Sequence, residues 1–332
     1  MTLKLAINGF GRIGRMVYRA FLENKPNGIE IVAINDLSSA AVSAHLLKYD
    51  SVHGILPQNV SSDDSRLIVD GQSINYVQQA DPANLPWASL GVDIVLECSG
   101  FFTSKESASK HIKAGAKKVL ISAPGTEVDL TVVYGVNHQK ITKDMTVISN
   151  ASCTTNCLAP VAHILHKNIG IKRGFMTTIH SYTGDQRLVD TAHKDLHRAR
   201  AGAVSMIPTS TGAAKAVGLV LPELAGKLDG VSVRVPTPNV SMIDLKCEVS
   251  RDTSKDEINA MMLEASNKDL KGILGYNTLP LVSIDFNHNP HSSVFDATQT
   301  YVMEGSFVRI MSWYDNEWGF SNRMLDTVLC MA

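Results

Sequence analysis

The sequence lacks the features that mark membrane, nucleic-acid-binding and disulfide-stabilised proteins. It has 31 Lys and Arg against 32 Asp and Glu, so no excess of positive charge favours nucleic acid or anionic lipid. No apolar run approaches the roughly 20 residues that a bilayer-spanning helix needs. The five cysteines are an odd number without zinc-site spacing, which favours a reducing compartment. We therefore expect a cytoplasmic protein with no metal site and with neither nucleic acid nor membrane as its primary partner.

The length and composition indicate an ordinary globular protein of two domains. The chain has 332 residues, of which 44% are hydrophobic, and it contains no low-complexity linker or internal repeat. A chain of this length is more naturally divided between two cores than built on one.

A glycine-rich loop follows the first strand-like stretch, Leu3–Ile7. Gly9, Gly11 and Gly14 fit the pattern G-x-G-x-x-G between that strand and a helical stretch over 16–23. In dinucleotide-binding folds these glycines provide a tight turn, close approach to the pyrophosphate and close helix–strand packing. Such a turn can also serve packing alone, but the strand, helix and acid that surround it favour a dinucleotide.

That acid is Asp36, which ends a second strand-like stretch over 29–34. It stands about 20 residues after the glycine loop, where a carboxylate holds a ribose 2′-hydroxyl. A carboxylate at this place would repel a 2′-phosphate, so NAD is favoured over NADP as the cofactor.

Strand-like and helical stretches alternate through the first half, which predicts an α/β fold with a Rossmann-type, doubly wound parallel sheet. Further strands are expected over 92–98, 118–122 and 130–134, and helices over 38–48 and 104–115. Ser99 and Ser122 follow two of these strands, where ligands of such sheets bind. Alternatively, Ser99 and Ser122 and the residues that follow them only form turns.

The second half has longer strands with more alternation, which predicts an α+β domain with a mostly antiparallel sheet. These strands are expected over 175–180, 230–235, 243–249, 281–286 and 307–313, and helices over 255–266 and 316–331. We predict a dinucleotide-binding domain over 1–151, with a C-terminal helix over 317–332 packing back on it. The catalytic domain is predicted over 152–316.

The segment Ser149–Asn156 places a thiol, Cys153, at the start of a helix. Ser152 is a helix-capping residue type, and an apolar face follows it at helical spacing. Pro160 is best tolerated near a helix start, which agrees with a start close to Cys153. The helix end should favour thiolate over thiol, which makes Cys153 a candidate nucleophile. Cys157 lies on the apolar face and is expected in the core.

Hydroxyl and arginine side chains in the second half suit an anionic substrate. They occur in the loop 181–187, in the helix entry 209–215, at Arg198, and at Arg234 before a Pro-Thr-Pro sequence. Singly, each is better explained as a solvated charge or a helix cap, and only their number favours two phosphate positions.

Together the motifs resemble the phosphorylating glyceraldehyde-3-phosphate dehydrogenases over essentially the whole length. The matching motifs are the glycine loop 7–15, the segment 149–156 around Cys153, 177–180, 211–216, 234–238 and 313–317. The resemblance implies that Cys153 attacks the aldehyde of glyceraldehyde 3-phosphate. It implies that His180 acts as the base while hydride passes to NAD, and that inorganic phosphate then cleaves the thioester to give 1,3-bisphosphoglycerate.

The resemblance also implies the remaining binding residues. Thr183 and Arg234 correspond to groups that bind the substrate phosphate. The residues expected around the attacking inorganic phosphate are Ser152, Thr154, Arg198, Thr211 and Gly212. The NAD contacts, besides the glycines, are Arg12, Ile13, Asp36, Ser122 and Asn316. The loop 181–203 resembles a segment that packs between subunits, so a homotetramer is implied.

Three departures from the family keep alternatives open. Phe320 stands where many members have Tyr, and Thr191-Ala192 stands where NAD-specific members often have Leu-Pro. Secondary use of NADP is therefore open. The tail 318–324 resembles erythrose-4-phosphate dehydrogenase, which is the alternative enzyme. A noncatalytic NAD-binding or adhesion protein is a remote alternative, because Cys153 and His180 are both present.

Overall fold

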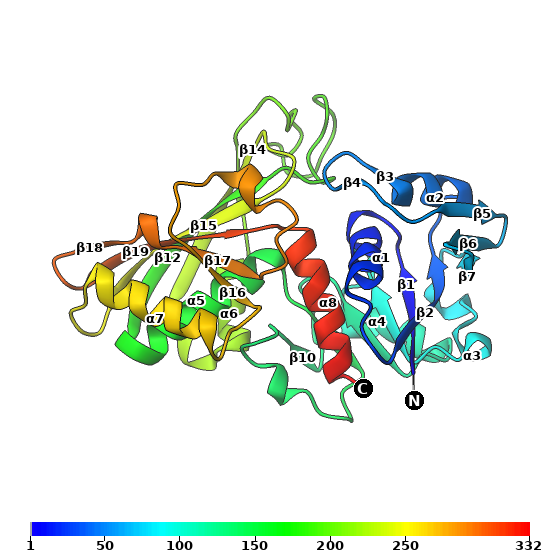
Figure 1. Cartoon of the computed structure of the whole chain (residues 1–332), viewed down its shortest axis with the longest axis horizontal. Coiled ribbons are helices and arrows are strands. Elements are labelled where there is room, and N and C mark those ends of the chain that lie inside the picture. The colour runs from blue at the N-terminus through cyan, green and yellow to red at the C-terminus, as the bar shows by residue number, and fades with distance from the viewer. Residues whose placement is uncertain (1) are drawn as a thin grey trace. The chain divides into compact units, whose positions relative to one another are not determined.

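The computed structural model describes residues 2–332 and divides the chain into two compact units. Unit 1 comprises the chain up to Val132, His138–Ala151 and Ser321–Ala332, and unit 2 comprises Val133–Asn137 and Ser152–Phe320. Among the described residues no helix is long and apolar enough to cross a membrane. Figure 1 shows the elements of each unit.

Unit 1 is built on a nine-stranded sheet in the order β10-β11-β9-β8-β1-β2-β7-β6-β5. Its strands are β1 (Leu3–Asn8), β2 (Ile29–Asn35), β5 (Val60–Asp63), β6 (Arg66–Val69), β7 (Gln72–Val77), β8 (Ile94–Glu97), β9 (Lys118–Ile121), β10 (Leu130–Thr131) and β11 (Val147–Ser149). The pairings from β10 through β7 are parallel, as the sequence predicts. The sequence did not predict β5 and β6, which add two antiparallel strands at one edge.

The helices of unit 1 connect the parallel strands and cover the sheet. They are α1 (Arg12–Asn24), α2 (Ala40–Lys48), α3 (Trp87–Leu90) and α4 (Lys105–Lys113), and a two-stranded ribbon of β3 (Tyr49–Asp50) and β4 (Gly54–Ile55) follows α2. One face of the sheet buries a cluster around Trp87, Val95 and Val119. From Ser321 onward, α8 (Trp318–Cys330) belongs to unit 1, where Thr327 Oγ1 donates to Asn150 Oδ1 at 2.8 Å.

Unit 2 contains an eight-stranded, mostly antiparallel sheet. Its strands are β12 (Ile171–Ser181), β13 (Ile207–Ser210), β14 (Leu228–Val235), β15 (Ser241–Val249), β16 (Leu274–Asn277), β17 (Ser293–Asp296), β18 (Tyr301–Met303) and β19 (Phe307–Tyr314). Only the pairs β12–β14 and β16–β17 are parallel among these strands. Helices α5 (Cys153–Ile169), α6 (Ala213–Val220) and α7 (Lys255–Asn267) pack beside this sheet (Figure 1).

Five short 3-10 helices complete the fold, and one of them corrects a prediction. They are Pro82–Asn84, His138–Lys140, Pro222–Leu224, Ser283–Phe286 and Ala297–Gln299. The stretch 281–286 was expected to be a strand and instead contains a 3-10 turn. The Asp285 carboxylate accepts from Val282 N at 2.9 Å and the Asp285 N–H donates back to Val282 O, which closes the turn.

The position of Pro160 also differs from the expectation. It lies inside the 17-residue helix α5 and not near its start. Because proline has no N–H, the carbonyl of Asn156 receives no i+4 helical bond there. The helix persists because nearly all of its side chains from Thr154 to Leu165 are buried, so tertiary packing stabilises it.

The glycine loop of unit 1 is packed backbone against backbone. Gly9 has φ +90°, and a Cβ there would lie 2.5 Å from Ser99 N. A Cβ on Gly14 would lie 2.2 Å from the Gly9 carbonyl oxygen. The third glycine therefore serves close packing of helix against loop. Gly11, in contrast, has no heavy atom within 4 Å of the place a Cβ would take.

These contacts predict different costs for two glycine substitutions. Gly14→Ala forces Cβ into the Gly9 carbonyl and should destabilise the protein by about 1–3 kcal/mol through overpacking. Gly11→Ala, the matched control, has open space and an ordinary φ of −73°, so it should cost about 1 kcal/mol or less. Thermal unfolding followed by circular dichroism checks this order, and equal melting temperatures for the two variants would contradict it.

Candidate active site

Cys153 is the first residue of α5, in unit 2. Ser152 is the N-cap, with extended backbone angles, and its Oγ accepts from Thr155 N at 3.0 Å. The predicted helix start is therefore confirmed. The Cys153 sulfur lies beside the end of the helix where backbone N–H groups point outward. Cys157 is fully buried near Ser293 Oγ, and burial raises the pKa of its thiol to about 12, as befits a core residue.

His180, near the end of β12, faces the Cys153 sulfur. Cys153 Sγ lies 3.6 Å from His180 Nε2, and the imidazole is almost completely buried. His180 Nδ1 lies 2.7 Å from the Ser181 carbonyl oxygen. We assign the tautomer in which Nδ1–H donates to that carbonyl. This tautomer leaves the lone pair of Nε2 directed at the sulfur, as a base requires.

Arg234 on β14 stands beside this pair because of the sheet register. β12 and β14 are parallel neighbours in which His180 lies opposite Arg234. Arg234 Nη1 donates to the Ser181 carbonyl at 3.2 Å. It also lies 2.8 Å from His180 Nδ1, but in the assigned tautomer both nitrogens are donors, so this approach is a close contact and not a hydrogen bond. Among the described residues no carboxylate forms an ion pair with Arg234, and its buried Nε has no hydrogen-bond partner. A half-buried guanidinium without an ion-pair partner is suited to binding an anion.

The charges around the thiol act in opposite directions. Burial raises the pKa of the Cys153 thiol, whereas the Arg234 charge and hydrogen bonds at Thr154 lower it, and the net direction is upward. Burial and Arg234 together lower the pKa of His180 to about 3. The sequence-based expectation of a thiolate favoured by the helix end is therefore not met in the protein alone.

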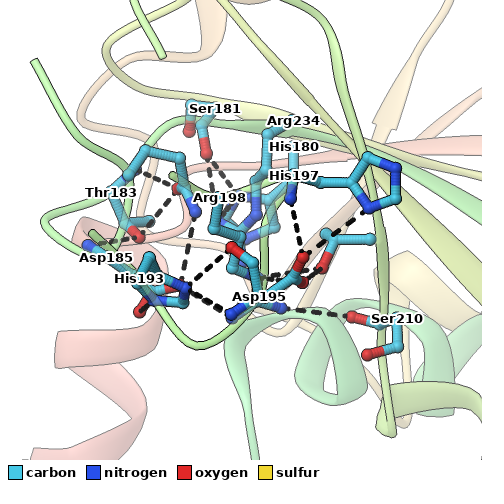
Figure 2. A network of polar contacts seen from close by, with 12 residues as sticks. His180, Ser181, Thr183, Asp185, His193, Asp195, His197, Arg198, Ser210 and Arg234 are labelled. Atoms are coloured by element: carbon cyan, nitrogen blue, oxygen red, sulfur yellow. Dashed lines mark hydrogen bonds and ion pairs between the residues drawn. The ribbon is translucent and has the colours of Figure 1, made fainter. Parts of the chain in front are cut away.

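The loop that follows β12 carries a polar network in the same unit (Figure 2). Arg198 lies between two carboxylates, with Nη1 2.7 Å from Asp185 Oδ2 and Nε 3.4 Å from Asp195 Oδ2. Its Nε also donates to Thr209 Oγ1 at 2.9 Å. The Thr183 N–H and hydroxyl both donate to Gln186 Oε1. Thr183 and Arg198 are thus connected through Asp185, and two carboxylates compensate the charge of Arg198. Arg234 contacts His180 and Ser181 instead.

The other predicted phosphate residues lie at the N-termini of two helices. Thr211 Oγ1 accepts from Ala213 N at 3.2 Å, and Gly212 is the N-cap of α6. Thr155 Oγ1 donates to the Ala213 carbonyl, which joins the first turn of α5 to that of α6. The Thr154 hydroxyl is buried against Tyr314 OH at 2.8 Å. Any contact of Thr154 with a phosphate would therefore come from its backbone.

Tyr314 lies in the motif 313–317, and the sequence predicted no role for it. Its hydroxyl lies within 2.9 Å of both Thr154 and Thr178, and its ring meets the His180 imidazole edge-on with centroids 5.9 Å apart. It therefore holds the helix that bears Cys153 and the strand that bears His180 in one arrangement. No spacing in the sequence points to this contact, because the partners lie far apart in the chain.

Asn316 has a fixed orientation in unit 2. Its Oδ1 accepts from Ser181 Oγ at 2.7 Å and from Ser241 Oγ at 2.9 Å. Because two hydroxyls occupy the oxygen, the amide NH2 is the group left to donate to a ligand.

Unit 1 contains a cavity of about 480 Å³ beside the glycine loop. Its lining residues are Asn8, Gly9, Gly11, Asn35, Asp36, Leu37, Gln79, Ala80, Cys98, Ser99, Phe101 and Phe102. The Asp36 carboxylate accepts from Phe10 N at 2.7 Å and from Ser38 N at 2.8 Å, which fixes it at the cavity wall. Apolar walls, open space at Gly11 and a fixed carboxylate suit a dinucleotide with a free ribose 2′-hydroxyl.

Four predicted cofactor residues of unit 1 do not line this cavity: Arg12, Ile13, Gly14 and Ser122. The Arg12 guanidinium is 2.5 Å from Asp50 Oδ2. Although burial raises the pKa of Asp50, hydrogen bonds from Arg12 and two backbone amides lower it to about 2. As the first residues of α1, Arg12 and Ile13 can meet a phosphate through the helix N-terminus. In the part of the chain described, no group of three His, Cys, Asp or Glu side chains could hold a metal.

Comparison with known proteins assigns both halves. Residues 3–105 match the family model "Glyceraldehyde 3-phosphate dehydrogenase, NAD binding domain", and residues 152–316 match the corresponding C-terminal domain. Glyceraldehyde-3-phosphate dehydrogenases of Xanthobacter flavus and Cereibacter sphaeroides are each 62% identical over 332 residues, covering all of this chain and 99% of the relative. Glyceraldehyde-3-phosphate dehydrogenase 1 of Bacillus subtilis is 57% identical over 333 residues with the same coverage. The sequence, both domains and these relatives agree: the chain belongs to the glyceraldehyde-3-phosphate dehydrogenase family.

Proposed function

We propose that the protein is an NAD-dependent phosphorylating glyceraldehyde-3-phosphate dehydrogenase of glycolysis and gluconeogenesis. It converts glyceraldehyde 3-phosphate and inorganic phosphate to 1,3-bisphosphoglycerate. The observation that carries the proposal is the 3.6 Å approach of Cys153 Sγ to His180 Nε2, in a chain of this family.

In the first step His180 moves a proton between sulfur and oxygen. As Cys153 Sγ forms a bond to the aldehyde carbon, its proton passes to His180 Nε2 and then to the carbonyl oxygen, giving a hemithioacetal with neutral imidazole. The low pKa of His180 keeps Nε2 available to accept that proton. The thiol needs no prior ionisation on this route.

In the second step His180 takes the hemithioacetal hydroxyl proton. NAD, when bound, accepts the hydride from the same carbon. The product is a thioester on Cys153, and inorganic phosphate attacks its carbonyl carbon. When the C–S bond breaks, the imidazolium returns its proton to the sulfur, so the chain is restored. A serine at position 153 would form an ester, which is a poorer acceptor for phosphate.

The anion sites are assigned by charge and by family position. Arg234 and Thr183 bind the substrate phosphate, because Arg234 is half-buried without an ion-pair partner and its Nε has no hydrogen-bond partner. Ser152, Thr154, Arg198, Thr211 and Gly212 surround the attacking inorganic phosphate. Two helix N-termini supply positive dipole ends among these residues.

We assign the following residues to NAD binding. Gly9, Gly11 and Gly14 form the loop, Arg12 and Ile13 offer helix N–H groups, and Asp36 accepts from the ribose. Ser122 borders the cofactor, and the Asn316 amide orients the nicotinamide carboxamide. We also propose that the domains are 1–151, with the helix 317–332, and 152–316.

A cytoplasmic homotetramer completes the proposal, and exposed apolar side chains support it. Leu188, Leu196 and Val204 in the loop after β12 are each at least 80% exposed. Several exposed apolar side chains on one loop favour a protein–protein interface at that loop. Sedimentation equilibrium should give four chain masses, and Leu188→Asp should give a smaller species. A wild-type protein that sediments as a monomer would contradict this assignment.

The activity itself is tested with two sugar phosphates. NADH formation should be faster with glyceraldehyde 3-phosphate than with erythrose 4-phosphate, and it should depend on inorganic phosphate. Preferred turnover of the four-carbon sugar without phosphate would favour the alternative enzyme. No turnover of either, with NAD still bound, would favour a noncatalytic protein.

Within that assay Cys153→Ala should lower activity on the order of 10⁴–10⁶-fold, because the only covalent nucleophile is lost. Cys157→Ala is the matched control: it removes a sulfur from the same helix, one that is buried in the core. It should retain most activity and lose some stability. Comparable loss of activity in both variants would refute the role of Cys153.

Arg234→Gln should shift the pH dependence of Cys153 alkylation. Burial raises the pKa of Cys153 and the Arg234 charge lowers it, so removing that charge should raise the pKa further. Alkylation by iodoacetamide depends on the thiolate, so its rate profile should move to higher pH than in wild type. An unchanged profile, in a variant that remains folded, would show that Arg234 does not act on the thiol.

A further inference from the structure

A buried carboxylate lies behind the cofactor cavity of unit 1 and has no place in the proposed chemistry. Glu97, the last residue of β8, is 1% exposed. Its Oε2 accepts from Asn8 Nδ2 at 2.5 Å and from His111 Nε2 at 2.9 Å. Its Oε1 accepts from Ser99 N at 2.8 Å and from the Ser99 hydroxyl. Four donors from three residues, Asn8, Ser99 and His111, therefore converge on one side chain.

The imidazole of His111 on α4 is locked in one orientation. Its Nδ1 accepts from Trp87 Nε1 at 3.0 Å, so the proton resides on Nε2 and is donated to Glu97. His111 is completely buried. Its ring also meets Phe102, which lines the cavity, edge-on at 6.3 Å between centroids. Trp87 thus orients His111, and His111 in turn orients the Glu97 carboxylate.

On the cavity side the hydrogen bonds continue across the ends of β1 and β2. Asn35 Nδ2 donates to Asn8 Oδ1 at 2.7 Å and to the Gln79 carbonyl at 2.9 Å. Gln79 N donates back to Asn35 Oδ1 at 2.9 Å. Asn8, Asn35 and Gln79 all line the cavity. A continuous network thus links Trp87, outside the cavity, to its polar lining.

The same carboxylate controls the glycine loop through Ser99. Glu97 binds both the N–H and the hydroxyl of Ser99, which fixes the turn after β8. A Cβ on Gly9 would lie 2.5 Å from both Ser99 N and Ser99 Cα, so the two backbones are in direct contact. Any movement of the Ser99 turn must move Gly9 or separate it from its packing partner.

Burying a carboxylate is costly, and near a pyrophosphate it also repels the ligand. These costs are offset only by interactions that a neutral side chain cannot reproduce. A carboxylate accepts four hydrogen bonds, whereas a glutamine of the same shape presents an NH2 toward two donors. The network therefore has a geometric requirement for an acid at this position.

We propose that Glu97, held by His111 and Trp87, is a positioning residue for NAD: it fixes the Ser99 turn and the Asn8 amide, and thereby the glycine loop. The inference rests on the proposed function, because its ligand is NAD. It predicts an effect on cofactor affinity that is separate from the chemistry at Cys153.

The test compares Glu97→Gln with a matched control in the same unit. Glu97→Gln should raise the Kd and KM for NAD about tenfold or more, because two buried donors lose their acceptor. At saturating NAD its kcat should stay within about twofold of wild type, as should the alkylation rate of Cys153 without NAD. Asp129→Asn is the control, because Asp129 accepts from Thr146 N and Val147 N away from the cavity. It should lower the melting temperature and leave the Kd for NAD unchanged.

An unchanged Kd in Glu97→Gln would overturn the inference, as would an equal rise in Asp129→Asn. If Glu97→Gln does not fold, Trp87→Phe is tested instead: it retains an aromatic ring in the core and removes the donor to His111, at the cost of some side-chain volume. A rise of about twofold or more in its Kd supports the inference, and wild-type affinity overturns it. Wild-type protein that neither binds NAD nor turns over substrate would instead refute the proposed function.

Discussion

The Arg234 guanidinium lies half-buried, 2.8 Å from His180 Nδ1, and has no ion pair among the described residues. Much of unit 2 can be understood from this charge. It lowers the pKa of the imidazole and opposes the effect of burial on the thiol. It also leaves a positive site that an anion can neutralise. Placing it there costs folding free energy, which the sheet and the buried helix α5 must offset.

Hydrogen bonds between segments far apart in the sequence hold the residues around Arg234 in place. Tyr314 joins the first turn of α5 to β12, and Thr155 joins α5 to α6. Ser181 and Ser241 fix the Asn316 amide from two strands. In unit 1 the Glu97 network has the same character, since polar groups at several strand ends are tied together under a cavity. In both units, therefore, hydrogen bonds from neighbouring side chains fix the orientation of the functional groups.

Local patterns in the sequence predicted the elements and the nucleophile. The capping residue type at Ser152 located the start of α5, and strand–glycine–helix spacing located β1 and α1. The strands β5 and β6 were missed because each has only four residues: β5 is mostly polar, and the three apolar residues of β6 are too short a run to predict a strand. The 3-10 turn at Ser283–Phe286 depends on one Asp285 hydrogen bond, which periodicity does not record.

The sequence predicted which residues belong to the site better than it predicted their pKa values and contacts. The helix end at Cys153 could be inferred from neighbouring residues, but the degree of burial that reverses the expected pKa shift depends on the whole of unit 2. Arg12 was assigned a ligand contact, whereas its side chain is committed to Asp50. Tyr314 and Glu97 act through partners far away in the chain. Such roles follow from tertiary contacts and leave no local signature.

The register of β12 against β14 has one further consequence. Side chains alternate between the two faces of a sheet, so a slip of one residue would carry Arg234 to the opposite face from His180. There is no intermediate pairing in which the two groups are partly aligned. The site is thus assembled in an all-or-none manner, and a population of chains with mixed strand pairing would contain fully competent and fully inert molecules rather than molecules of graded activity.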